Sequence, residues 1–391
     1  MIYNDFQGIR LSMLGFGAMR LPQTGDAIDE AQTEAMVRLA MENGVNYFDT
    51  AWPYHGGNSE IVLGRALSHY PRETWYLADK YPGHQFSSRY DPADIFEKQL
   101  QKCGVEYFDF YLLHNVCELS QPVYLDPQWG IVDYFVRQRK LGRIRHLGFS
   151  SHAAVDGLRD ILDHIGSEME FCQIQLNYLD WTLQDARAKC ELLAERGIPV
   201  WVMEPMRGGK LSNLDETVMA RLRAVLPEAT ATEWALRWLQ RLPQVGVVLS
   251  GMSSPEQMRQ NIATFQEREP LSDAETAVLM DVADTLKNAI PCTGCRYCVE
   301  GCPRGLDIPF LLSSYNDFRF APAASVGMRL DALPEDKRPS ACVGCGACAR
   351  ICPQKIDIPA HLHAFAAELA QRPSWAQICR EREEAARRLQ K

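Results

Sequence analysis

Short apolar runs rich in β-branched residues alternate with longer stretches of helical periodicity through the first 270 residues. The alternation predicts eight strands, at residues 11–17, 46–50, 75–80, 108–114, 146–150, 171–176, 199–203 and 245–250. It predicts helices between them, at residues 29–43, 59–68, 92–103, 128–141, 155–166, 184–196, 230–240 and 255–265. Eight such units indicate a parallel sheet that closes into a (β/α)8 barrel. A doubly wound open sheet is the alternative, but no G-x-G-x-x-G motif follows an early strand to support it.

The rest of the chain predicts a second, helical part. Residues 274–288 have the pattern of a helix that joins the two parts, and residues 375–391 predict a charged terminal helix with a solvated face. We therefore expect a barrel at 1–270, a connecting helix at 271–288, a small α-helical domain at 289–372 and a charged helix at 373–391.

Composition and charge exclude several classes of protein. The chain has 391 residues, of which 46% are hydrophobic and 23% charged, and no apolar stretch approaches the ~18 residues of a membrane span. The net charge of -9 does not favour a nucleic acid or an anionic membrane as partner. The start, MIYNDFQGIR, lacks the basic and apolar regions of a secretory signal. We expect a soluble, globular, cytoplasmic protein.

Eight of the thirteen cysteines form two short runs with one spacing, C-x2-C-x2-C-x3-C-P. The first run is Cys292, Cys295, Cys298 and Cys302, before Pro303; the second is Cys342, Cys345, Cys348 and Cys352, before Pro353. This spacing is typical of bacterial [4Fe–4S] proteins, in which each run gives its fourth thiolate to the other cluster. We therefore expect Cys352 to join the first three cysteines of the first run, and Cys302 those of the second.

Zinc and disulfides are the alternatives for these cysteines. Zinc gives no reason for the crossed fourth cysteine or the trailing proline, and disulfides do not persist in a reducing cytosol. Two [4Fe–4S] clusters are the better interpretation. The scattered cysteines are expected to be buried and inert: Cys103, Cys117, Cys172, Cys190 and Cys379.

The two runs belong to an internal repeat with a period of 50 residues. Residues 292–309 and 342–359 match at nine of eighteen positions, including Asp307-Ile308-Pro309 against Asp357-Ile358-Pro359. An Asp two residues before a Pro suits the start of a helix, with the Asp as N-cap. Each run should thus lead into a helix, an arrangement similar to the α-helical ferredoxins.

In a barrel of this kind, active sites lie on the loops at the carboxyl ends of the strands. Four polar residues fall there: Asp49 ends the second predicted strand, Tyr54 lies in the loop after it, Lys80 ends the third and His114 ends the fourth. Singly, Asp49 could be a cap, Lys80 a surface charge and His114 a core histidine. Because they occur at three consecutive strand ends, we expect these residues to form a catalytic site.

These residues resemble the Asp/Tyr/Lys/His tetrad of the aldo-keto reductases. The resemblance covers about residues 1–270 and includes Phe48-Asp49-Thr50-Ala51-x-x-Tyr54, Asp79-Lys80 and Leu112-Leu113-His114. With the cysteine runs, it points to the iron–sulfur branch of that family. It implies an NAD(P)-dependent oxidoreductase that interconverts a carbonyl and an alcohol.

The resemblance implies a role for each tetrad residue. Tyr54 would donate a proton to the substrate oxygen, and Lys80 would lower the pKa of this tyrosine from its usual value near ~10. Asp49 would hold Lys80 charged and oriented, and His114 would align the substrate oxygen.

The same resemblance implies a set of cofactor contacts. Ser150 and Gln173 would hold the nicotinamide carboxamide, and the Met206-Arg207-Gly208-Gly209 loop would approach the pyrophosphate. The full set of expected cofactor-binding residues is Met19, Asp49, Ser150, Ser151, Gln173, Met203, Met206, Gly208, Gly209, Gly251, Ser253, Gln257 and Asn261.

This chain departs from the family pattern at several of those positions. Ser151 replaces a frequent Asn, and Met203 replaces an aromatic residue that stacks on the nicotinamide. Gly251 and Gln257 stand where Lys and Arg often bind the 2′-phosphate of NADP, with Arg259 nearby but out of register. The choice between NADP and NAD stays open.

The clusters leave a further alternative open. A hydride moves two electrons and a [4Fe–4S] cluster one. The clusters could be structural, could relay electrons between an external redox protein such as ferredoxin or flavodoxin and an unseen cofactor, or could sense oxygen or redox state. An electron carrier on a barrel without reductase turnover is therefore the alternative to a reductase, and the complete tetrad argues against it. Residues 82–91 and 116–129 would shape the site for a small carbonyl or alcohol substrate, with Trp52 and His55 beside Tyr54.

Overall fold

In the computed structural model, described for residues 1–85, 87, 89–286, 290, 292, 294–320, 324–352 and 354–389, eight parallel strands close into a barrel. The strands follow the order of the chain around the barrel, and β12 pairs with β3 to close it. They are β3 (Leu14–Gly17), β6 (Tyr47–Asp49), β7 (Tyr76–Tyr81), β8 (Phe108–Leu113), β9 (Ile144–Ser151), β10 (Cys172–Gln175), β11 (Val200–Met203) and β12 (Val245–Ser250). The predicted (β/α)8 barrel is confirmed, and the open sheet is excluded.

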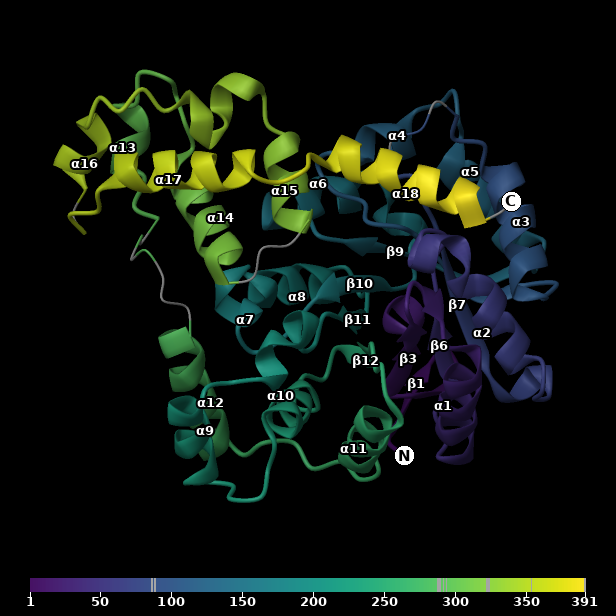
Figure 1. Ribbon diagram of the computed structural model, residues 1–391. Helices are drawn as coiled ribbons and strands as arrows, with labels where there is room; N and C mark the ends of the chain where they lie inside the picture. Colours follow the sequence, from purple (N-terminus) through teal and green to yellow (C-terminus); the bar gives the residue numbers. More distant parts are fainter. Residues whose placement is uncertain are drawn as a thin grey trace.

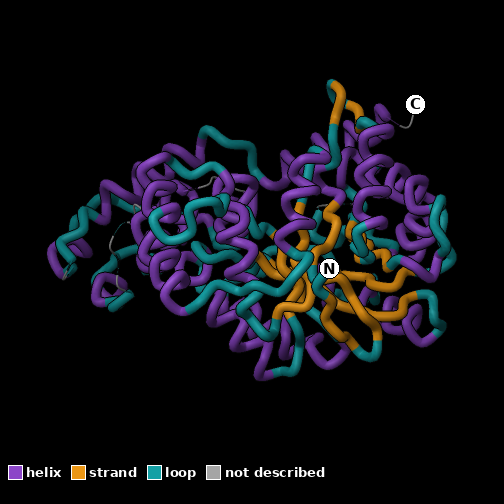
Figure 2. Tube along the Cα trace, turned by 90° about the horizontal axis from the view of Figure 1, so that it is seen from below, coloured by secondary structure: helices purple, strands orange, loops and turns teal. Residues whose placement is uncertain are grey.

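Helices surround the strands of the barrel (Figure 2). Along the chain they follow the predicted order. They are α1 (Glu30–Glu42), α2 (Ser59–Leu67), α3 (Pro92–Cys103), α4 (Gln121–Leu125), α5 (Ile131–Lys140), α6 (Val155–Ile165), α7 (Asp180–Leu183), α8 (Ala186–Glu195), α9 (Glu216–Arg223), α10 (Ala231–Leu239) and α11 (Pro255–Thr264). Side-chain oxygens begin several of them, since Asp29, Asp91 and Thr230 each accept a bond from a backbone N–H of the first turn. The sequence pattern did not predict α9 or the two short helices α4 and α7.

An N-terminal hairpin closes the end of the barrel opposite the loops that follow the strands. It consists of β1 (Tyr3–Phe6) and β2 (Ile9–Ser12), and a second small hairpin of β4 (Gln23–Thr24) and β5 (Ala27–Ile28) follows. Phe6 contacts the rings of Phe110, Phe171 and Trp201 inside the barrel. This plug leaves the other end of the barrel as the place where a ligand can enter.

The helix α12 (Asp273–Leu286) packs against the barrel. Leu279, Val282 and Ala283 are fully buried in the barrel's core, and Asp281 is ion-paired with Arg221 of α9. The predicted helix over residues 274–288 thus forms up to Leu286, and its last two residues lie outside the described part.

The C-terminal part is built from helices, without a strand among its described residues. It contains α13 (Tyr297–Glu300), α14 (Ile308–Phe320), α15 (Ala324–Asp331), α16 (Ala347–Ile351), α17 (Ile358–Ala370) and α18 (Trp375–Leu389). Asp357 caps α17 as predicted, through a bond from the Ala360 N–H, and Asp307 accepts from the Phe310 N–H at the start of α14. The helices α13, α14, α16 and α17 form a lobe beside the barrel, which we call the cysteine lobe, and α18 runs back over the barrel (Figure 1).

Across the described ranges, no helix has the length and apolar character that a membrane crossing requires. The division of the chain at residues 270, 288 and 372 stays a prediction.

Candidate functional site

The four polar residues predicted at strand ends lie together at the carboxyl ends of β6, β7 and β8. Asp49 and Lys80 are almost fully buried, and the Lys80 ammonium donates to Asp49 Oδ1 at 2.5 Å and to the Thr50 carbonyl at 2.7 Å. Tyr54 begins a 3-10 turn, η2 (Tyr54–Gly57), and its ring centre lies 5.0 Å from Lys80 Nζ. The His114 ring stands nearly perpendicular to that of Tyr54, with 5.9 Å between centres.

Burial and the neighbouring charges set the protonation of this group. Burial lowers the pKa of Lys80, but the Asp49 carboxylate and other neighbours outweigh burial, so that this pKa lies above its ordinary value. Burial also raises the pKa of Tyr54, and the opposing effect of Lys80 is smaller. The expected net lowering of the Tyr54 pKa is therefore wrong in direction, because the strength of burial could not be read from the sequence. At neutral pH the site holds a charged lysine beside a protonated phenol.

His114 and a second imidazole form a neutral pair. Burial lowers the pKa of His114 well below its ordinary value, with the neighbouring His84 as the next cause. The two ring centres lie 4.3 Å apart, and the Nδ1 atoms of both rings are buried without a partner in the described residues. The sequence reading placed His84 only within a pocket-shaping loop, since its approach to His114 depends on the fold.

The residues expected at the nicotinamide lie on β9, β10 and β11. Ser150 is opposite Gln173 in the register, and both are buried. Ser150 Oγ accepts a bond from the Asn115 N–H at 2.7 Å, and Ser151 Oγ donates to the Val116 carbonyl at 2.7 Å. Gln173 Oε1 is buried and has no hydrogen-bond partner in the described residues, so it offers an acceptor to a ligand.

Met203 and the loop after β11 lie next to this group. Met203 is half-buried at the end of β11. Beyond it, Gly208 and Gly209 have φ angles of 65° and 91°, a region of backbone conformation that favours glycine. The Met206 carbonyl accepts a hydrogen bond from the Gly209 N–H at 2.9 Å, which closes the turn. The loop therefore exposes backbone without side chains at the position expected to approach the pyrophosphate.

Arg207, in the same loop, points away from that exposed backbone. Its side chain is buried and ion-paired with Asp180 of α7, at 3.1 Å, and with Asp317 of α14. Asp317 also accepts from Arg329 of α15 at 2.5 Å and from Gln184 at 2.8 Å. We call Asp180, Gln184, Arg207, Asp317 and Arg329 the interface network, because it joins the loop after β11 to the C-terminal part. No motif in the sequence indicates this network.

The remaining expected contacts surround the loop after β12. Ser253 Oγ donates to the Arg20 carbonyl at 2.8 Å, and the Ser253 N–H donates to Gln257 Oε1 at 2.8 Å. Asn261 is buried, and its amide donates to Ser250 Oγ. Gly251 and Met19 are exposed. Gln257 and Ser253 thus bind each other, and Asn261 orders the end of β12.

Arg20 is a residue that the sequence reading missed. A Cβ on Gly251 would lie 3.0 Å from Arg20 Cδ, and one on Gly208 would lie 3.4 Å from Arg20 Nη2, so this side chain extends between the two loops. Its guanidinium is 3.4 Å from Glu204. Arg20, from the turn after β3, thus places a cation beside position 251. Trp52 and His55 have structural partners, since Lys102 lies 4.0 Å above the Trp52 ring and His55 Nε2 accepts from the Leu21 N–H.

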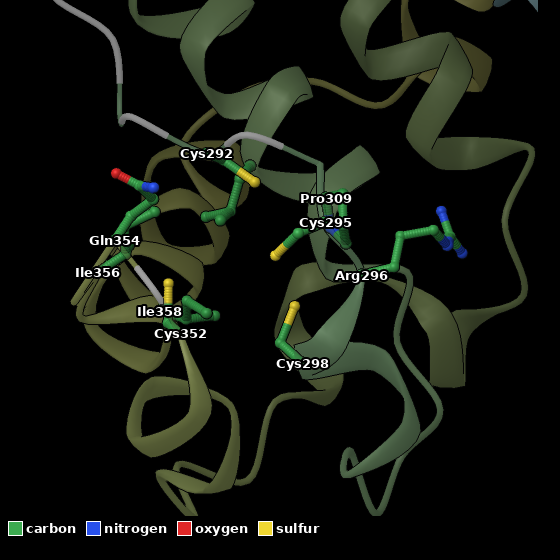
Figure 3. A pocket seen from close by; sticks show the side chains of 10 residues that line it. Cys292, Cys295, Arg296, Cys298, Pro309, Cys352, Gln354, Ile356 and Ile358 are labelled. Carbon is green, nitrogen blue, oxygen red and sulfur yellow. The ribbon is translucent and has the colours of Figure 1, made fainter.

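The eight clustered cysteines line two hollows in the cysteine lobe, four cysteines to each. Figure 3 shows the sulfur atoms of Cys292, Cys295, Cys298 and Cys352 directed toward one space. The second hollow is lined by Cys302, Cys342, Cys345 and Cys348. The fold thus brings the fourth cysteine of each run to the other run. Pro303 lines the second hollow, and Pro353 lies outside the described residues.

The residues at each hollow fit a cubane, because a [4Fe–4S] cluster takes four thiolates and each hollow is lined by four cysteines, three from one run and one from the other. No described cysteine is in a disulfide. The five scattered cysteines are all buried, as expected.

Comparison with known proteins assigns both parts of the chain. The aldo/keto reductase family model matches residues 13–284, and a 4Fe-4S dicluster domain model matches residues 291–356. The chain is 25% identical over 330 residues to an NADH-specific methylglyoxal reductase of Escherichia coli (strain K12), covering 71% of this chain and 97% of that protein. It is 26% identical to the L-galactose dehydrogenase of Arabidopsis thaliana, covering 69% and 89%. A solved aldo-keto reductase from Bacillus halodurans, in its holo form, superposes with a TM-score of 0.60 at 25% identity, covering 72% of this chain and 96% of that one.

Proposed function

Because this chain belongs to the aldo/keto reductase family and carries a 4Fe-4S dicluster domain, we propose that it reduces an aldehyde or ketone to an alcohol, or catalyses the reverse reaction, with NADPH or NADH. The observation that carries the proposal is the buried Lys80–Asp49 ion pair beside Tyr54 and His114. An isolated buried lysine would lose its charge, whereas this one keeps it next to a phenol.

We propose that Tyr54 donates the proton to the carbonyl oxygen. The raised pKa keeps its phenol protonated at neutral pH, as a general acid must be. As the proton leaves, the Lys80 ammonium stabilises the phenolate that forms, and Asp49 keeps the ammonium oriented. The neutral His114 can donate a hydrogen bond to the same substrate oxygen, which fixes the carbonyl carbon in place. The nicotinamide supplies the hydride when it is bound.

The residues at the expected cofactor groove fit a dinucleotide. Gln173 Oε1 has no partner in the described part of the chain and could accept from a carboxamide, while Gly208 and Gly209 leave space for a pyrophosphate. We propose that Arg20, beside Gly251, gives the 2′-phosphate of NADP a charged donor. Arg20 favours NADPH over the NADH named for the Escherichia coli relative.

We propose that Cys292, Cys295, Cys298 and Cys352 hold one [4Fe–4S] cluster and that Cys302, Cys342, Cys345 and Cys348 hold the other. The two cysteine-lined hollows support this crossed assignment. When bound, the clusters would exchange single electrons. We also propose that the chain divides into a barrel at 1–270, a connecting helix at 271–288, a helical domain at 289–372 and a terminal helix at 373–391.

Replacing Tyr54 with Phe tests the reductase function. NADPH and NADH consumption would be measured with purified, cluster-loaded protein against a panel of aldehydes and ketones. Loss of the general acid should lower kcat about 10²-fold or more, while the affinity for the dinucleotide stays unchanged. The exposed Tyr297 provides the matched control, since Tyr297→Phe should keep full activity. Equal activity of Tyr54→Phe and the control would refute the proposal.

A further inference from the structure

The helix α18 lies on the catalytic end of the barrel, although it follows both cysteine runs in the sequence. It packs against the turn η2 that contains Tyr54 and continues toward α3 and α5 (Figure 1). Its first residue, Trp375, is buried, with 4% of its surface exposed, and Trp375 Nε1 donates to the His84 carbonyl at 2.9 Å. The terminal helix, which the sequence predicts to be solvated, is therefore exposed on only part of its surface, because Trp375 packs against the barrel.

Trp375 connects α18 to the catalytic group through a row of rings. It stacks on His84 with 5.7 Å between centres, and His84 lies against His114, which faces Tyr54. The unpartnered Nδ1 atoms of His84 and His114 leave two buried polar positions that no described protein group satisfies. Such positions next to a reaction centre are where a substrate makes its hydrogen bonds.

Arg382 brings a positive charge to the same end of the barrel. It lies two turns after Trp375, on the same face of α18, and its Cζ is 5.2 Å from the Trp375 ring centre. The side chain is half-buried and has no ion pair in the described residues. Its charge also contributes to the lowered pKa of His84, after burial, and is the smallest of the causes that lower the pKa of His114.

The acidic residues of α18 are engaged elsewhere. Glu381 accepts from Gln377, and the remaining two acids pair with arginines one turn later: Glu383 with Arg387 and Glu384 with Arg388. Arg382 therefore lies over an aromatic ring near two neutral imidazoles, and no carboxylate in the described part of the chain is paired with it. A guanidinium in such a place binds a planar anion well, because it offers two parallel donors and needs little desolvation.

We propose that α18 completes the substrate site, with Trp375 as its wall and Arg382 as the residue that binds a carboxylate on the substrate. The inference rests on the proposed carbonyl reduction and narrows it to aldehydes or ketones that also carry an acid group. Arg382 is a specificity-determining residue in this assignment, whereas the tetrad performs the chemistry on any bound carbonyl.

The test compares acids with their isosteric amides in the cluster-loaded protein. The probes are 4-carboxybenzaldehyde against 4-carbamoylbenzaldehyde, and succinic semialdehyde against its amide, so that two separations of carbonyl and acid are covered. Arg382→Gln should lower kcat/KM for the acids about 10- to 100-fold, mainly through KM, and change it for the amides less than about twofold. Arg380→Gln removes an exposed arginine from a different face of α18 and should leave all four values unchanged. Equal losses for acids and amides, or no loss, would overturn the proposal.

The two proposals fail in different ways. Loss of amide turnover in Tyr54→Phe tests the reductase function. The ratio of kcat/KM for the acid to kcat/KM for the amide tests the role of Arg382. If no aldehyde is turned over, calorimetric binding of 4-carboxybenzyl alcohol still tests Arg382. The affinity should fall in Arg382→Gln and not in Arg380→Gln, and equal affinities would refute the inference. Unchanged iron content and circular dichroism confirm that each variant is folded.

Discussion

Asp317 is a buried anion at the contact between the barrel and the C-terminal part. Only 1% of its surface is exposed, and it pairs with Arg207 from the loop after β11 and with Arg329 from α15, while also accepting from Gln184. Asp180 is the other acid that pairs with Arg207. Asp317 is therefore shared by two buried guanidinium groups, and only that of Arg207 has a second carboxylate partner among the described residues.

Replacing Asp317 with Asn keeps the size of the side chain and removes its charge. Arg207 would keep its ion pair with Asp180, but Arg329 would lose its ion-pair partner among the described residues. Leaving a buried charge without its partner costs roughly 3–5 kcal/mol. Little of this cost is screened by solvent, because the side chains of Arg207 and Arg329 are only 4% and 10% exposed. Asp336 provides the control, since it is 65% exposed and 3.8 Å from Lys337, and such a pair contributes at most about 1 kcal/mol.

The cost should appear as easier separation of α7 and α14, which the network joins. Hydrogen exchange followed by mass spectrometry reports the free energy of this opening. In the cluster-loaded Asp317→Asn variant, peptides from both helices should exchange about 10²- to 10⁴-fold faster, while peptides from β7 and β8 keep their protection. Asp336→Asn should change these rates less than about tenfold. If the two variants exchange alike, the interface network does not hold the parts together.

Three further predictions concern the catalytic group, the clusters and the cofactor. The rate of reduction should stay constant through neutral pH and fall only above about pH 10, because burial raises the pKa of Tyr54 and the proton-donating form is lost as the pH rises; a kcat profile that declines near neutrality would contradict this. The double variant Cys302→Ala/Cys345→Ala should keep about four iron atoms per chain, since both cysteines line one hollow. The double variant Cys302→Ala/Cys295→Ala should keep almost none, since its cysteines line different hollows. The reverse result in an iron analysis would show that each run holds its own cluster. Arg20→Gln should weaken NADPH binding about tenfold and NADH binding much less, as measured by fluorescence titration, and equal losses would remove Arg20 from the phosphate site.

The sequence carries enough local information to predict the barrel. Each strand is a short apolar run between helices of amphipathic pattern, and this alternation does not depend on distant residues. The positions of Asp49, Lys80 and His114 follow from the same pattern, because the carboxyl ends of neighbouring parallel strands meet at one edge. The cysteine spacing and the Asp-x-Pro helix starts were equally readable.

What could not be predicted depends on contacts between distant segments. The direction of the Tyr54 pKa shift follows from burial, which no residue near position 54 reveals. Arg207 resembles any loop arginine in the sequence, and its partner Asp317 is an acid within an ordinary helix. The charged pattern of residues 375–391 predicts a solvated helix, and only the fold shows that Trp375 is buried against the barrel.

The contact between Trp375 and His84 joins residues 291 positions apart, and its timing follows from the direction of translation. N-terminal domains generally fold first as a chain leaves the ribosome, so the barrel can close while residue 375 has yet to be added. Both cysteine runs emerge in the interval. A nascent polypeptide, or one terminated before residue 375, therefore carries an assembled barrel whose reaction centre lacks this cover.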